Sequence, residues 1–310
     1  MTALAGLVSK LAAGAAAPAS PASPASPATP IATALAPLTA SGWGRWRRRA
    51  RPLLGTLVEV GLSLPIDGSA GGLGWESTQP DEGAANAAFD AAFAAIQSAQ
   101  ACLSRFESRS DIARFNALRG GQRLRLRPIT RDLLQAAYEL HTASGGVFDI
   151  SQGTAPQGWR LDGDWLEKCD DRTQLDLAGI GKGHAVDLAV LALQGQGCAA
   201  GWVNAGGDLR VFGALDLPLQ LRCETGGGVR PFGSLRDGAF ATSALGGPHR
   251  ARLVGVTPTV EVHVSVAAPL CLWADALTKV VAANADANGR TCLALLARFG
   301  AQAWRHGDSA

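Results

Sequence analysis

Alternation of apolar and polar positions predicts several β-strands. In residues 51–62, Val58 and Val60 flank Glu59, as expected of a strand with one buried face. Valines recur at every second position of "PTVEVHVSVAA" (258–268), which predicts the clearest strand in the chain. The segment "GWVNAGGDLRVFG" (201–213) predicts two short strands joined by a Gly-Gly turn, and residues 301–306 predict a last strand.

Apolar residues at helical spacing predict five helices. The first is an alanine-rich segment in which Phe89, Phe93 and Ile96 fall on one face. The expected ranges are 84–104, 129–145, 183–193, 272–285 and 289–300. Helices and strands alternate without a regular βαβ repeat, which favours an α+β fold of mixed, largely antiparallel sheets packed with helices.

The first 45 residues differ in composition from the rest. They are rich in Ala, Pro and Ser, as in "PASPASPATP", and cannot build a core. We therefore expect a disordered segment over residues 1–45 and one folded domain over residues 46–310. Lys10 interrupts the apolar start and no basic residues precede it, so the segment makes a poor secretory signal. This favours the cytoplasm, with a periplasmic or inner-membrane-associated location as the alternative.

Charge and cysteine content exclude some classes of protein. The formal net charge of +2 is well mixed along the 310 residues, so we expect no nucleic-acid partner. The basic segment "RWRRRAR" (45–51) is interpreted as a solvated edge. No apolar run approaches the ~20 residues of a membrane span. The six cysteines form no CxxC pair, which argues against zinc. The apolar surroundings of Cys198, Cys271 and Cys292 favour roles as small buried hydrophobic residues.

The segment "DLAGIGKGHAVD" (176–187) combines glycines, a lysine and aspartates ahead of a predicted helix. It fits neither a P-loop nor a GxGxxG pattern. Free amides at a helix start and the charge of Lys182 nevertheless suit an anion. A phosphate-binding turn and a tight structural turn both remain open. His184, at the start of the same helix, is a candidate polar group of this possible site, although an ordinary surface position would also explain it.

Two further segments contain polar side chains of chemical interest. In "ADALTK" (274–279), Asp275 and Thr278 share a helix face and could hold Mg²⁺, although an Asp–Lys pair explains the pattern too. In "GGVFDIS" (145–151), Phe148 could cover a flat ring beside Asp149, or be a core aromatic beside a turn aspartate. Asp208 ends the predicted Gly-Gly turn.

These segments, taken in order, resemble the ApbE family of FAD:protein FMN transferases. The resemblance runs from Arg51 to Trp304. It rests on "PLLGTLVEV", "SRFESRSDIARFN", "ASGGVFDIS", "LDLAGIGKGHAVD", "VNAGGDLRVFG" and "ADALTK". It implies an ApbE-like fold and transfer of FMN from FAD to a threonine of an acceptor flavoprotein, with Mg²⁺ and release of AMP.

The resemblance also assigns site residues. The residues implied to contact FAD are Leu54, Phe106, Val147, Phe148, Asp149, Asp176 and Lys182. The metal oxygens implied are the backbone carbonyl of Gly179 and the side chains of Asp275 and Thr278. A general base is not evident, and Asp208 and His184 are candidates for an orienting role in catalysis.

The chain departs from the family pattern at two places. Lys279 replaces a threonine of the family's metal site, and an ammonium group repels a cation. An Asp-Pro pair of a histidine-containing segment is replaced by Gly255–Val256. Two alternatives to transfer therefore stay open: an FAD pyrophosphatase that forms FMN and AMP, and a non-catalytic FAD-binding protein.

Overall fold

The computed structural model describes five parts of the chain, which are residues 46–63, 82–222, 228–245, 262–284 and 289–306. The predicted disordered segment and the Gly255–Val256 replacement lie outside them. The described residues fall into two compact units, divided near residues 217 and 235. The smaller unit includes most of a two-stranded sheet, formed by β8 (Leu217–Arg222) and β9 (Val229–Leu235).

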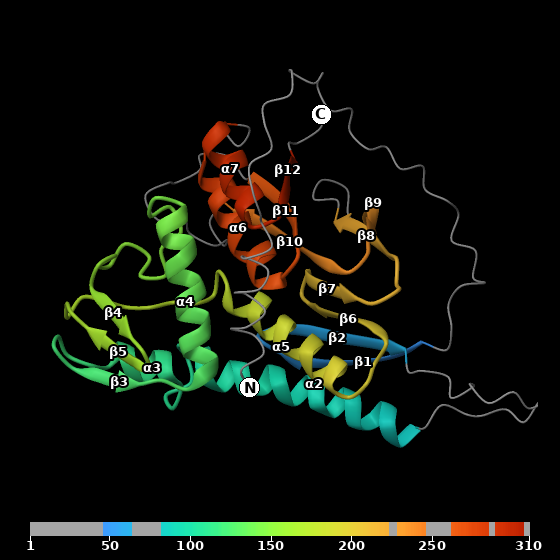
Figure 1. The fold of residues 1–310 in the computed structure, drawn as a ribbon, viewed down its shortest axis with the longest axis horizontal. Helices are drawn as coiled ribbons and strands as arrows, with labels where there is room; N and C mark the ends of the chain where they lie inside the picture. Colours follow the sequence, from blue (N-terminus) through green and yellow to red (C-terminus); the bar gives the residue numbers. More distant parts are fainter. Residues whose placement is uncertain (1–45, 64–81, 223–227, 246–261, 285–288, 307–310) are drawn as a thin grey trace, which may run out of the picture. The chain divides into compact units, whose positions relative to one another are not determined.

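A seven-stranded antiparallel sheet is the centre of the larger unit (Figure 1). Its strand order is β1-β2-β6-β7-β10-β11-β12. The strands are β1 (Arg47–Leu53), β2 (Thr56–Ser63), β6 (Ala200–Ala205), β7 (Asp208–Phe212), β10 (Gly238–Leu245), β11 (Val262–Ala268) and β12 (Gln302–His306). The predicted strands at the Gly-Gly turn and at the C-terminus are thus confirmed, as is the α+β class.

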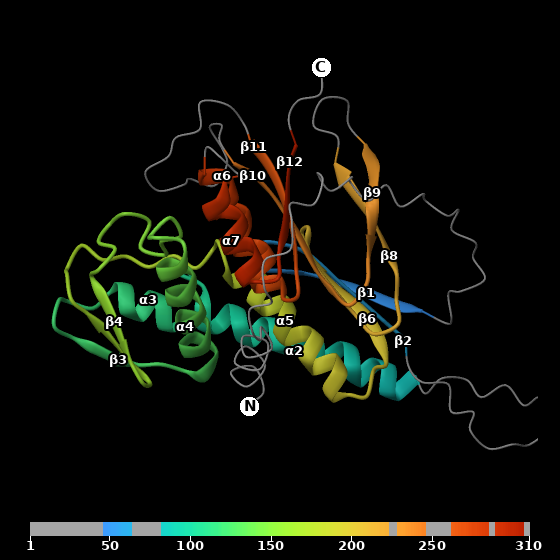
Figure 2. The same ribbon diagram turned by 45° about the horizontal axis from the view of Figure 1, so that its top comes forward.

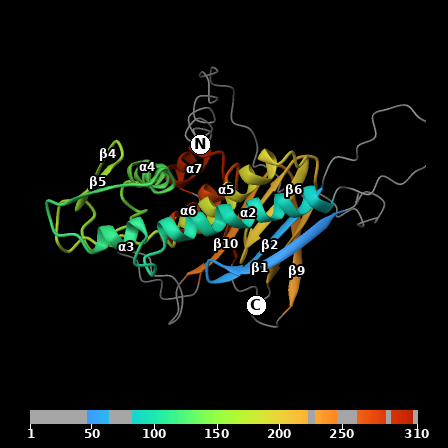
Figure 3. The ribbon, with the colours of Figure 1, turned by 90° about the horizontal axis from the view of Figure 1, so that it is seen from below.

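Three helices pack against the strands of this sheet. They are α2 (Glu82–Leu103), α5 (Gly181–Gly195) and α6 (Cys271–Ala283). Figure 3 shows α2 and α5 side by side along the sheet, and α6 contacts β10 and β11. Fully buried Val58, Val60 and Phe93 belong to the core between these layers. Helix α7 (Arg290–Arg298) contacts β12.

A smaller layer lies beside α4 (Pro128–Ala143) in the larger unit (Figure 2). A three-stranded sheet of order β3-β5-β4 forms it with the short helix α3 (Asp111–Asn116). Its strands are β3 (Arg123–Arg125), β4 (Trp159–Asp162) and β5 (Trp165–Lys168). Sequence patterns did not predict these strands, because three or four residues are too few to establish a period. No described helix is both long enough and apolar enough to cross a bilayer.

The strand predicted over residues 51–62 is confirmed from Thr56 onward as β2, but its continuity is wrong, because a hairpin turn separates β2 from β1. Leu54 and Gly55 both have positive φ, 54° and 71°, and they reverse the chain between β1 and β2. A leucine seldom adopts this conformation, so the pattern gave no turn signal at Leu54. The Leu54 amide donates to Oε1 of Gln100 at 2.9 Å, which anchors the turn to α2.

The basic segment forms the edge strand β1, and alternate arginines of that strand lie along α2. Every second residue of a strand and every fourth of a helix advance by similar lengths, ~6.7 Å and ~6 Å. The two rows therefore stay matched over three pairs, which are Arg47–Glu82, Arg49–Asn86 and Arg51–Asp90. The predicted solvated edge is confirmed, and it also attaches α2 to the sheet.

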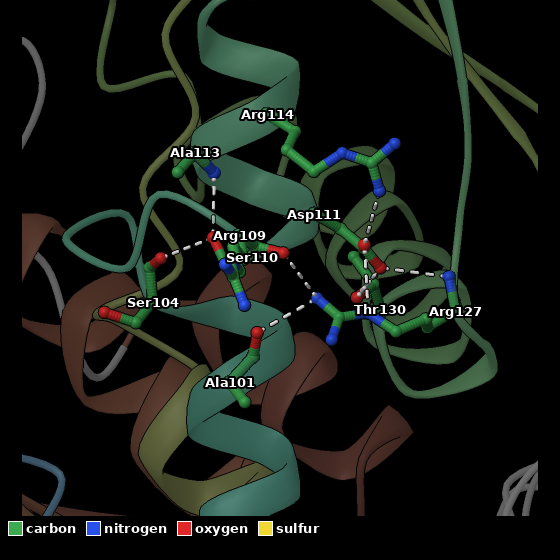
Figure 4. Close-up of polar contacts among 9 residues, drawn as sticks. All are labelled: Ala101, Ser104, Arg109, Ser110, Asp111, Ala113, Arg114, Arg127 and Thr130. Carbon is green, nitrogen blue, oxygen red and sulfur yellow. Dashed lines mark hydrogen bonds and ion pairs between the residues drawn. The ribbon is translucent and has the colours of Figure 1, made fainter.

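A buried carboxylate connects α3 to the start of α4 (Figure 4). Asp111 is fully buried and accepts hydrogen bonds from the backbone amide and Nε of Arg127 and from the Thr130 hydroxyl. Arg127 also donates to the Ala101 carbonyl near the end of α2. Helix α4 begins at Pro128, so Thr130 lies within its first turn, and the Thr130 hydroxyl binds Asp111.

Candidate functional site

The N-termini of α5 and α6 meet at a glycine. A Cβ atom on Gly183 would overlap the backbone of Cys271 and Leu272, so a larger residue would keep the helices apart. Asp187, one turn further along α5, accepts from the amides of Cys271 and Leu272, both at 2.9 Å. These contacts fix the first turn of α6 against α5, and the side chain of Asp275 is thereby brought to the start of α5.

Two lysines and two aspartates form a charged cluster at this junction. Nζ of Lys182 lies 2.6 Å from Oδ2 of Asp208. Lys279 forms an ion pair with Asp275. Oδ2 of Asp275 accepts from the Gly183 amide at 3.3 Å. Lys182, Asp208 and Asp275, each assigned to the site from the sequence, are thus brought together.

The environment of the cluster alters its ionisation. Burial raises the pKa of Asp208 to about 6, with repulsion from Asp275 adding to the effect against attraction from Lys182 and Lys279. Burial opposes the charged form of Lys182, but Asp208 and Asp275 outweigh it and raise the pKa of this amine. Lys182 therefore stays cationic near neutral pH, whereas Asp208 can change its charge close to it.

Gly179 connects the charged cluster to the aromatic side of the site. A Cβ atom on Gly179 would lie 3.7 Å from Cε of Lys279 and 3.7 Å from a ring carbon of Phe148. Phe148 is nearly buried, and its carbonyl lies 2.8 Å from Nδ1 of His141. No sequence pattern singled out His141, which positions the backbone of this turn.

Asp149 and Asp176 hold turns beside Phe148. Asp149 accepts from the Ser151 amide at 2.8 Å and from the Gly153 amide at 3.0 Å, and so stabilises its own turn. Asp176 accepts from the Ala178 amide at 2.9 Å. Its backbone amide donates to the Ile150 carbonyl at 2.8 Å. Both carboxylates are therefore already used in shaping the loops.

An exposed aromatic ring marks the outer end of this region. The ring of Phe106 is 81% exposed, and the guanidinium of Arg105 lies 4.4 Å from its centre. Nε of Arg105 in turn lies 3.1 Å from Oδ2 of Asp176. Val147 is also partly exposed. An exposed ring of this kind is available to stack against a flat ligand.

A shallow pocket lies at the β1–β2 turn. Its volume is about 380 Å³, and it is lined by residues 52–57 and Gln100, Leu54 among them. Thr56 at this turn contacts Gly206, so closely that a Cβ atom on Gly206 would overlap the threonine side chain. The pocket therefore adjoins the β6–β7 turn that leads into Asp208.

His184 lies apart from the charged cluster. Its side chain is buried, and neither ring nitrogen has a hydrogen-bond partner of good geometry within the described chain. Its charged neighbours are Asp187 and Asp132, and Ile129 of α4 is nearby. Burial lowers the pKa of His184, which favours a neutral ring. A location between helices gives it no access to a substrate held at Lys182.

The oxygens implied for magnesium do not fit a metal ion. The ammonium of Lys279 contacts the Asp275 carboxylate and lies 2.9 Å from the carbonyl of the same residue. The hydroxyl of Thr278 lies 2.7 Å from that carbonyl. Mg²⁺ requires oxygens at ~2.1 Å in an octahedron, which the ammonium group prevents. Nor does any group of three or more His, Cys, Asp or Glu gather as a metal site among the described residues.

The predicted phosphate-binding turn is only partly open to a ligand. The Gly181 amide donates to the Leu177 carbonyl at 2.7 Å, and the Gly183 amide donates to Asp275. Two of the first helical amides are therefore engaged within the protein. The positive end of the α5 dipole and the ammonium of Lys182 can still attract an anion.

Comparisons with known proteins agree with this architecture. The ApbE family model matches residues 54–164 and 154–245, together more than half of the chain. The apo flavinyl transferase ApbE of Pseudomonas stutzeri is similar in fold, with a TM-score of 0.66, 21% identity, and coverage of 85% of this chain and 92% of that one. The flavin transferase ApbE of Vibrio cholerae is also similar in fold, with a TM-score of 0.65, 16% identity, and coverage of 84% of this chain and 93% of that one.

The ApbE protein of Thermotoga maritima gives a TM-score of 0.63, 18% identity, and coverage of 84% of this chain and 94% of that one. A search of curated proteins finds no match. At these identities the solved structures establish the fold, while the family model establishes the relationship. The chain belongs to the ApbE family.

Proposed function

We propose that this protein is a transferase that moves FMN from FAD to a threonine of an acceptor flavoprotein and releases AMP. One observation carries the proposal: three separate segments of an ApbE-family chain, which contribute Gly179 with Lys182, Asp208, and Asp275, meet in one charged site. Two ApbE structures of similar fold are named flavin or flavinyl transferases.

The residues suit the binding of a flavin dinucleotide. The diphosphate of FAD is anionic, and the ammonium of Lys182 at the start of α5 offers it charge and hydrogen bonds. The exposed ring of Phe106 supports stacking with flavin or adenine. Leu54 and its neighbours line a pocket that could take part of the ligand. Asp208 acts on the ligand through Lys182 and is a positioning residue.

In the proposed reaction, the threonine hydroxyl oxygen forms a bond to the phosphorus of the FMN half. The bond from that phosphorus to the oxygen bridging the two phosphates breaks, and AMP leaves with the bridging oxygen. The hydroxyl proton passes to a base that the described residues do not identify. Lys182 stabilises negative charge on the phosphate oxygens as this exchange proceeds. Magnesium dependence stays a prediction from the resemblance, and the donor set at Asp275 argues against it.

The direct test is mass spectrometry of a flavoprotein acceptor incubated with the protein and FAD. We expect the acceptor to gain the mass of FMN less one water on a threonine, with AMP formed in equal amount. An acceptor with that threonine replaced by valine is the control. FMN and AMP released at the same rate without acceptor would indicate a pyrophosphatase. FAD bound and left intact would indicate a binding protein.

A second test separates the aromatic contact from general surface effects. Phe106→Ala should weaken FAD binding about tenfold, because base–aromatic stacking contributes ~1–3 kcal/mol. Tyr138→Ala is the matched control, since Tyr138 on α4 is also an exposed aromatic, 60% exposed, and it packs against Trp159 of β4. Quenching of flavin fluorescence measures both affinities. Equal loss in the two variants would contradict a role for Phe106.

A further inference from the structure

Lys279 holds its ammonium group in a shell of oxygens. The group contacts the carboxylate of Asp275, the Asp275 carbonyl at 2.9 Å and the hydroxyl of Ser243 at 3.2 Å. These oxygens come from two elements, α6 and β10. An exposed lysine would extend into water, whereas this side chain is only 16% exposed and turns back onto its own helix. The geometry is that of a cation held by oxygen donors.

The charge balance of the cluster leaves little room for another cation. Lys182 and Lys279 contribute two positive charges, and Asp208 and Asp275 contribute two negative charges. A divalent ion bound at Asp275 would displace the ammonium or lie beside it. In the second case the two cations would repel each other strongly in a partly buried site.

Lys279 also faces the part of the site where we place the substrate. Its Cε atom lies 3.7 Å from the position of a Cβ on Gly179, next to the ring of Phe148. Gly179 belongs to the turn that precedes Lys182. Lys182 and Lys279 also both lie within electrostatic range of Asp208, so an anion bound at this turn would be attracted by both ammonium groups.

We propose that the ammonium group of Lys279 takes the place of a divalent metal ion in this site, so that the protein binds the diphosphate of FAD without metal. This inference rests on the proposed function for the identity of the ligand. The ammonium neutralises phosphate oxygens by charge and by N–H donation, and it keeps Asp275 paired when no ligand is bound.

The experiment combines FAD affinity with metal binding. Flavin fluorescence gives the Kd for the wild type, Lys279→Thr and Lys279→Gln, each in EDTA and in excess Mg²⁺. We expect the wild-type Kd to agree within about twofold between the two buffers. Both variants should bind about tenfold more weakly in EDTA, the effect of losing one charge-assisted contact. Mg²⁺ should restore much of the affinity of Lys279→Thr, in which Asp275 becomes available.

The second measurement is Mn²⁺ binding followed by electron paramagnetic resonance, without FAD. We expect no tight Mn²⁺ site in the wild type, one in Lys279→Thr, and none in Lys279→Thr/Asp275→Asn. A tight wild-type site that Asp275→Asn removes would overturn the proposal. So would wild-type FAD binding that EDTA abolishes, or equal FAD affinity in EDTA with and without Lys279.

The two readouts separate this inference from the proposed function. If FAD binds under no condition, the proposed function fails, and the Mn²⁺ titration of the wild type still decides whether Lys279 excludes a metal. Circular dichroism checks the folding of each variant. If neither variant folds, the wild-type Kd in the two buffers and the wild-type Mn²⁺ titration decide the outcome.

Discussion

Asp208 and His184 show how burial determines what a titratable side chain can do. Asp208 is buried among Lys182, Lys279 and Asp275, so its charge affects any anion bound at the lysines. His184 is buried among helices, and its charged neighbours are Asp187 and Asp132. Both residues were candidates for an orienting role, and their surroundings separate them: Asp208 is paired with the lysine proposed to bind substrate, while His184 has no such partner.

FAD affinity should depend on pH through Asp208. The pKa of this carboxyl is raised to about 6, so it becomes neutral as the pH falls below that value, while Lys182 remains charged. Loss of one negative charge beside the site favours the diphosphate, and we expect about tenfold tighter FAD binding at pH 5 than at pH 7.5. Fluorescence titrations at both pH values measure this. Asp208→Asn should bind with nearly the same affinity at both, and an undiminished dependence in that variant would assign it to another group.

Thermal stability should fall in acid because of His184. Burial lowers the pKa of this ring in the folded state, so the unfolded chain binds a proton more readily. The stabilising effect of the neutral ring is fully present above the unfolded value of ~6.5 and is lost as the pH falls through the lower folded value. His184→Leu should therefore lose less Tm between pH 7.5 and 5 than the wild type, and should keep FAD binding. Loss of FAD binding in a folded His184→Leu variant would indicate that His184 contributes to the FAD site.

At the scale of elements, the junction of α5 with α6 builds the charged cluster. Gly183 allows the two helix N-termini to approach, and Asp187 caps the first turn of α6 through two backbone amides. Arg210 on β7 also donates to Asp187 at 2.8 Å and connects the junction to the sheet. Small shifts of these elements would separate Asp275 from Lys182.

Two glycines two residues apart give a matched test of this junction. Gly183→Ala places a methyl group onto the backbone of Cys271, which cannot yield as a flexible side chain can. We expect a loss of about 2 kcal/mol in stability and at least tenfold in FAD affinity. Gly181→Ala meets its first neighbour, Cβ of Leu177, at 3.7 Å and should behave as the wild type. Chemical denaturation and fluorescence titration give the two quantities. Similar effects in both variants would mean that helix flexibility, not packing, explains them.

At the scale of the whole molecule, the site draws on loops and helices that are far apart in the chain. The contacts connect residues 54–56, 100–106, 147–150, 176–183, 206–208 and 275–279. All of them belong to the larger compact unit. A ligand that contacts several of these segments binds the folded chain and not the unfolded one.

FAD should therefore stabilise the protein against heat. With FAD at a hundred times its Kd, the gain is ~2.7 kcal/mol, which corresponds to a rise in Tm of about 5–10 °C for a domain of this size. Differential scanning fluorimetry with an extrinsic dye would be confounded by flavin emission, so circular dichroism is the suitable measurement. Riboflavin, which has no phosphate, should give a much smaller rise. An equal rise with riboflavin would show that the lysines contribute little.

Sequence patterns predicted the longer elements well. The helices expected over 84–104 and 183–193 are α2 and α5, and the alternation of valines gave β11. The pattern failed where a conformation is imposed by contacts, as at Leu54, whose positive φ is held by a hydrogen bond to Gln100. It also failed for β3, β4 and β5, which are too short to show a period.

The sequence by itself determined which segments could carry chemistry, because glycines, lysines and aspartates cluster in "DLAGIGKGHAVD" and "ADALTK". The sequence could not show which of these side chains would be buried or engaged in structural contacts. Asp187 became a helix cap, Asp149 stabilised a turn, His184 was buried, and Lys279 engaged Asp275. Tertiary structure decided these roles, since the ionisation and availability of a polar group depend on the atoms that surround it, and those atoms come from distant parts of the chain.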